Sequence, residues 1–78
     1  IFDDVVNSLK DVKDENIEGV VELMKWNKDK VKSNIDTIIE CFIKKGSNSI
    51  NIFEEYIIEY CQEEKYDYIA KLKLKEIT

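Results

Sequence analysis

Apolar residues recur along the chain at the spacing of a single helix face. Positions i, i+3, i+4, i+7 and i+10 are apolar in the first segment, which predicts an amphipathic helix over 2–13. The same spacing predicts a second helix over 16–26 and a third over 28–45. The apolar positions of the three segments are, in order, Phe2, Val5, Val6, Leu9 and Val12; Ile17, Val20, Val21 and Met24; and Val31, Ile35, Ile38, Ile39 and Phe42.

The end of the third segment is the clearest boundary in the sequence. Lys44 and Lys45 complement the carbonyls at a helix C-terminus, and Gly46 can adopt the positive φ that ends a helix. A polar turn is then expected at 47–49, followed by a fourth helix over 51–62 that begins with a capping box of Asn51 and Glu54. A fifth helix is expected over 66–76, although the alternation at 72–75 is also typical of a strand. The pattern leaves open whether the last two helices are continuous.

These helices predict one all-α domain covering residues 1–78. The expected architecture is a compact antiparallel bundle of four to five short helices. An alternative is a two-hairpin fragment of a HEAT/TPR-like solenoid, because a short apolar-acidic motif recurs at intervals of 18 and 19 residues. The three copies of that motif are Val20-Val21-Glu22, Ile38-Ile39-Glu40 and Ile57-Ile58-Glu59.

The composition excludes most catalytic chemistry. The chain of 78 residues contains no histidine and no arginine, so a nucleophile activated by histidine is impossible within it. Two glycines are too few for a phosphate-binding loop or a dinucleotide fingerprint. No run of about 18 apolar residues predicts a membrane span, and no signal peptide is visible. We therefore expect no enzymatic activity and predict no catalytic, cofactor-binding or metal-ligating residue.

The charge pattern favours a protein partner over nucleic acid. The formal net charge is −5, which suits solubility or a basic partner. All twelve cationic side chains are lysines, and together with twelve isoleucines and six asparagines this composition is typical of an AT-rich genome.

The two cysteines are expected to be buried thiols. If the chain reverses near Asn48, Cys41 lies seven residues before the turn and Cys61 thirteen after it. The difference of six residues corresponds to about 9 Å along antiparallel helices, which is too far for a disulfide. A reducing compartment, cytoplasmic or nuclear, is the expected location.

Two helices carry more apolar surface than one core requires. In the fourth helix, Ile52, Tyr56 and Tyr60 belong to an apolar face that covers about half of its circumference. In the second, three residues form a line opposite the apolar stripe: Gly19, Leu23 and Trp26. These six residues are the predicted partner-binding face, which would hold a protein or peptide such as an amphipathic helix. The competing interpretation is that both helices are central and pack against neighbours on two sides.

The predicted function is a non-enzymatic adaptor or scaffold module for protein–protein interaction, and its apolar surface also allows self-association. The alternative is a small nucleic-acid-associated domain. Its predicted contacts are the lysines around the tryptophan together with those at the C-terminus. These lysines are Lys25, Lys28, Lys30 and Lys32, followed by Lys71, Lys73 and Lys75.

Overall fold

A computed structural model describes Leu9 and residues 13–77 of the chain, apart from the side chain of Asp14. Every regular element in this part is helical. The elements are the short 3-10 helix η1 (Asp14–Asn16) and the α-helices α2 (Ile17–Lys25), α3 (Lys28–Ser33), α4 (Ile35–Lys45), α5 (Ser47–Tyr60) and α6 (Lys65–Ile77). The all-α class is therefore confirmed, whereas the predicted helix 2–13 lies outside the described residues except for Leu9 and Lys13.

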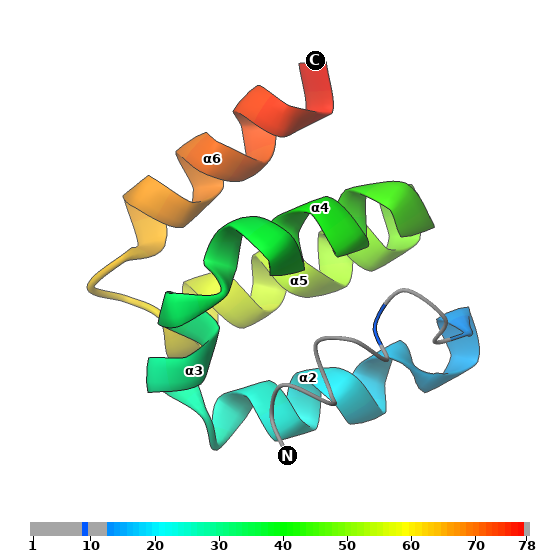
Figure 1. The fold of residues 1–78 in the computed structure, drawn as a ribbon, viewed down its shortest axis with the longest axis horizontal. Coiled ribbons are helices and arrows are strands. Elements are labelled where there is room, and N and C mark those ends of the chain that lie inside the picture. The colour runs from blue at the N-terminus through cyan, green and yellow to red at the C-terminus, as the bar shows by residue number, and fades with distance from the viewer. Residues whose placement is uncertain (1–8, 10–12, 78) are drawn as a thin grey trace.

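The hairpin of α4 and α5 forms the centre of the molecule (Figure 1), with α2 against α5 on one side and α6 against both helices on the other. Gly46 alone connects the two helices of the hairpin. Its φ of 105° is a conformation that side chains disfavour, as the sequence predicted for a glycine at this position. The chain reverses within one residue, and α5 therefore begins at Ser47 and not at Asn51. The predicted polar turn at 47–49 is the first turn of α5 instead.

The predicted helix over 28–45 is divided at Asn34. The backbone angles of Asn34, φ −116° and ψ 19°, lie outside the helical region, and this residue separates α3 from α4. The Asn34 side-chain amide donates a hydrogen bond to the Lys30 carbonyl at 2.8 Å, an interaction by which asparagine competes with the helical ladder. Val31 and Ile35, on either side of this break, are both buried in the core.

Helix α6 runs parallel to α4 and antiparallel to α5 (Figure 1). It is a helix throughout, including the segment 72–75 whose alternation is also typical of a strand, and a turn at 61–64 separates it from α5. Three of its lysines form ion pairs with carboxylates of the central hairpin. The Nζ–oxygen distances are 3.4 Å for Lys71–Asp36, 2.8 Å for Lys73–Glu54 and 3.0 Å for Lys75–Glu40.

The core contains a run of stacked aromatic rings among aliphatic side chains. Phe42 of α4 stacks on Phe53 of α5 with ring centroids 4.6 Å apart. The stack continues along α5 to Tyr56 and Tyr60 at centroid distances of 6.2 and 5.8 Å. Cys41 and Cys61 are buried thiols, which confirms the prediction that they do not pair with each other. None of the described helices combines the length and apolar character that a membrane span requires.

Candidate functional site

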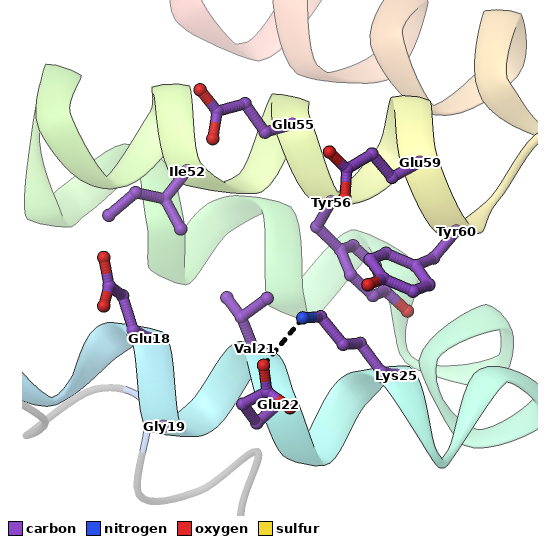
Figure 2. A pocket seen from close by; sticks show the side chains of 10 residues that line it. All are labelled: Glu18, Gly19, Val21, Glu22, Lys25, Ile52, Glu55, Tyr56, Glu59 and Tyr60. Atoms are coloured by element: carbon purple, nitrogen blue, oxygen red, sulfur yellow. Dashed lines mark hydrogen bonds and ion pairs between the residues drawn. The ribbon is translucent and has the colours of Figure 1, made fainter.

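A groove of about 350 Å³ runs between α2 and α5 (Figure 2). The two helices are parallel here, so residues 18–25 and 52–60 line its walls in the same order. Glu18 and Ile52 mark one end, and Lys25 and Tyr60 mark the other. We call this feature the α2–α5 groove; its lining residues are Glu18, Gly19, Val21, Glu22, Lys25, Ile52, Glu55, Tyr56, Glu59 and Tyr60.

Carboxylates border the α2–α5 groove on both sides. Glu18 and Glu22 project from successive turns of α2, and Glu55 and Glu59 do so from α5. All four residues are exposed. Among the described residues that line the groove, Lys25 is the one cation against these four negative charges, so the lining has a net negative charge.

Lys25 neutralises one end of this groove. Its ammonium donates a hydrogen bond to Glu22 at 2.7 Å and lies 4.7 Å from the centre of the Tyr60 ring. The bond to the Glu22 carboxylate, with a smaller contribution from Tyr60, raises the pKa of Lys25 above its ordinary value. Three carboxylates are thus left without a cation from the groove lining: Glu18, Glu55 and Glu59.

The floor of the α2–α5 groove is apolar. Val21 is buried, while Ile52 and Tyr60 are half-buried and keep part of their surface accessible from the groove. Beneath them Tyr56 is only 2% exposed, and its hydroxyl donates a hydrogen bond of 3.1 Å to the Met24 carbonyl at the end of α2. Burial raises the pKa of the Tyr56 hydroxyl well above its ordinary value. This hydrogen bond links α5 to the C-terminal end of α2 beneath the groove.

The structure divides the six predicted partner-binding residues into two groups. Gly19, Ile52, Tyr56 and Tyr60 all line the α2–α5 groove. Leu23 and Trp26 are exposed, by 48% and 84%, but they are not part of the groove lining.

The prediction of Tyr56 as an exposed anchor is wrong. Helix α5 packs between α2 and the α4–α6 side, so the middle of its broad apolar face is enclosed. The competing interpretation, that α5 is a central helix, holds for this residue.

The lysines of the nucleic-acid alternative do not share one face. Lys25 lines the α2–α5 groove, whereas Lys28 and Lys32 lie in a depression with Glu59, Glu63 and Glu64. Helix geometry places Lys30 about 160° around α3 from Lys28. The three C-terminal lysines are engaged in the ion pairs of α6. A continuous basic surface, which a nucleic-acid backbone requires, is therefore not formed by these residues.

Polar groups near the end of α5 are held in their neutral forms. Burial raises the pKa of the Cys61 thiol, and burial together with the nearby Glu64 raises the pKa of Tyr68 to about 12. A thiol with a raised pKa is a poor nucleophile. Among the described residues, no group of three or more cysteine, aspartate or glutamate side chains is placed to hold a metal ion.

Sequence reasoning missed the acidic walls as a pair. The acidic side of α5 is visible in the sequence as a run of glutamates, whereas Glu18 and Glu22 were not predicted to form an acidic wall. Their i, i+4 spacing, the same as that of Glu55 and Glu59, was the available signal. The two pairs border one groove because α2 and α5 pack in parallel. The spacing of residues along the sequence does not predict this packing.

Comparison of the chain with protein-family models, with curated proteins and with solved structures found no match.

Proposed function

We propose that the protein is a non-enzymatic interaction module whose α2–α5 groove binds a basic amphipathic segment of a partner protein. The observation that carries this proposal is the combination of an accessible apolar floor, Ile52 and Tyr60, with acidic walls. Apolar side chains of the partner would occupy the floor, and lysine or arginine side chains on either side would meet the glutamates.

The spacing of the walls specifies the partner further. Each wall carries two carboxylates one helical turn apart, or about 6 Å. A helix lying along the groove therefore presents basic residues at i and i+4 on both flanks of its apolar stripe. At the end occupied by Lys25, a neutral or acidic side chain fits better than a basic one because like charges repel.

The test uses a synthetic helical peptide of leucine and lysine with one apolar and one basic face. Its dissociation constant is measured by fluorescence anisotropy of a labelled copy at low and moderate salt. The controls are a peptide of the same composition in scrambled order and an amphipathic leucine–glutamate peptide. We expect binding of the first peptide only, with affinity that falls as salt increases.

Replacing glutamates of the walls by glutamine tests whether the peptide binds in the α2–α5 groove. The double variant Glu18→Gln/Glu55→Gln removes one carboxylate from each wall and should weaken binding by about 3- to 10-fold, since each exposed ion pair contributes up to about 1 kcal/mol. The matched control Glu15→Gln/Glu63→Gln removes the same charge from exposed positions outside the groove. If both double variants weakened peptide binding equally, or if the scrambled peptide bound equally well, the peptide would be attracted by net charge alone and the proposal would be rejected.

The solenoid fragment is the architectural alternative that we keep. A parallel α4–α6 pair with α5 antiparallel to both is also the arrangement that successive hairpins of a solenoid would give. In that case the same groove would belong to a longer concave surface, and the peptide experiment applies unchanged.

A further inference from the structure

Helix α6 has two apolar faces, and only one is packed against other residues that the structure describes. Tyr68 and Leu72 are buried against the central hairpin. On the opposite side four apolar residues are exposed, three of them by 62–82%. At 100° per residue the four lie within about 80° of one another and are centred opposite the buried pair. We call them the outer stripe: Tyr66, Ala70, Leu74 and Ile77.

The charges beside the outer stripe are largely neutralised within the chain. Lys71, Lys73 and Lys75 form ion pairs with the central hairpin, and the ammonium of Lys65 lies 5.0 Å from the centre of the Tyr66 ring. Asp67 lies at the edge of the stripe, 20° from Leu74 around the helix. No ion pair of Asp67 is present in the part of the chain that the structure describes. The stripe is thus an apolar surface with the Asp67 carboxylate at its edge and the Lys65 ammonium against the ring of Tyr66.

Three residues of the outer stripe, Tyr66, Ala70 and Leu74, are arranged symmetrically about Ala70, whereas Ile77 has no apolar counterpart. Tyr66 lies four residues before Ala70 and Leu74 four residues after it, about 6 Å in each direction along the axis. An antiparallel copy with its two-fold axis at Ala70 would therefore place Tyr66 against Leu74 of the second copy, twice. The small Ala70 side chains at the axis would let the helices approach closely.

The same symmetry brings opposite charges together. Along the helix axis, Asp67 would lie level with Lys73 of the second copy. Lys71 of that copy, two residues away, would then be displaced from Asp67 by about 3 Å along the axis. In the described chain Lys71 makes the longest of the three ion pairs to the hairpin, at 3.4 Å, and it has an exposed side chain that can be shared. We propose that the outer stripe of α6 is a self-association surface and that its occupant is an antiparallel second copy of this chain.

The expected dimer is weak. A helix of 13 residues is about 20 Å long, and one of its faces covers less than the roughly 800 Å² per partner of a stable interface. Dissociation in the micromolar to millimolar range is therefore expected. Sedimentation velocity of the full chain from about 10 µM to 1 mM should show a monomer that converts to a dimer as concentration rises.

Two matched variants test whether the chain self-associates through the outer stripe. Leu74→Glu places a charge in the outer stripe and should shift the dissociation constant at least 10-fold towards the monomer. Leu23→Glu makes the same change at an exposed leucine of α2 and should leave self-association unaltered. Thermal melts by circular dichroism check that both variants fold. A chain that stays monomeric up to 1 mM, or a dimer that Leu74→Glu leaves intact, would overturn the proposal.

A cysteine placed at the axis tests the register. Ala70→Cys should form a disulfide-linked dimer under mild oxidation, because the two residues meet across the axis, whereas Thr37→Cys at an exposed position of α4 should not. The native Cys41 and Cys61 are buried and so do not compete. Equal crosslinking at both positions would reject the antiparallel contact. The glutamate variants of the α2–α5 groove leave α6 unchanged, so self-association and peptide binding succeed or fail separately.

Discussion

The hydroxyl of Tyr56 is a single group whose removal should change both the stability of the protein and its response to alkali. In Tyr56→Phe the ring keeps its place in the stack, but the buried hydrogen bond to the Met24 carbonyl is lost. That carbonyl still accepts a bond from the backbone N–H of Asn27, so no buried acceptor is left without a partner. The expected loss at pH 7 is therefore about 1 kcal/mol, the net contribution of an ordinary hydrogen bond.

At alkaline pH the Tyr56 hydroxyl lowers the stability of the wild type, whereas at pH 7 it raises it. Burial raises the pKa of Tyr56 far above its ordinary value of 10.0, so above pH 10 the unfolded chain releases this proton while the folded protein keeps it. The free energy of unfolding of the wild type therefore falls with rising pH, by up to about 1.4 kcal/mol per pH unit from this group. Tyr56→Phe lacks this contribution.

The two effects should balance at one pH. The alkaline penalty of the wild type reaches about 1 kcal/mol near pH ~10.6, about 0.6 of a unit above the pKa of an unfolded tyrosine. Below that pH the wild type is more stable, and above it the variant is. Tyr68, whose pKa is also raised, titrates in both proteins and cancels in the difference. Cys61 does not cancel, because its hydrogen bond with the Tyr56 hydroxyl lowers the pKa of the thiol and is lost in Tyr56→Phe, so the Cys61→Ala background is used for both proteins.

Urea unfolding followed by circular dichroism, at half-unit steps from pH 7 to 11, measures this difference. Near pH 7 a loss of about 1 kcal/mol corresponds to about 4–8 °C in melting temperature for a chain of this size. A constant difference between the two proteins from pH 7 to 11 would refute the reasoning, because it would mean that the Tyr56 hydroxyl ionises in the folded state as readily as in the unfolded chain.

Three further substitutions have defined outcomes in thermal or urea melts. Gly46→Ala should destabilise the protein by about 1–2 kcal/mol because φ is 105° there. Gly19→Ala lies in a helix and has open space around the new methyl group, so it should stabilise the protein by up to about 1 kcal/mol. Equal effects of the two substitutions would contradict the role assigned to the backbone conformation of Gly46. Ser49→Ala should stabilise by about 1 kcal/mol, since the buried hydroxyl has no hydrogen-bond partner among the described residues; a loss of stability would reveal a partner. Trp26→Ala should change stability by less than about 0.5 kcal/mol because the side chain is 84% exposed, and a larger loss would place it in the core.

Local chemistry made much of the fold predictable. The apolar spacing identified the helical segments from residue 17 onward, and Gly46 marked the end of α4 because its positive φ is a conformation that other residues avoid. The break at Asn34 was not predicted, because the apolar spacing continues through it from Val31 to Ile35. The asparagine side chain, which bonds to the backbone of α3, is the physical signal that was overlooked.

The candidate site was predictable only in part, since it depends on contacts between distant segments. Gly19, Ile52 and Tyr60 were identified from excess apolar surface, and they do line the α2–α5 groove. Tyr56 was misplaced because a broad apolar face does not show which of its residues a neighbouring helix covers. The outer stripe of α6 was readable at i, i+4, i+8 and i+11, but the alternation at 72–75 obscured it.

We propose above that a basic amphipathic helix binds in the α2–α5 groove. The most direct test of this proposal is a titration of the ¹⁵N-labelled protein with the leucine–lysine peptide, followed by two-dimensional amide NMR spectra. We expect the largest chemical-shift changes on residues 18–25 and 52–60, which form the two walls of the groove. Changes concentrated on α3 or α6, or no saturable change at all, would contradict the proposal.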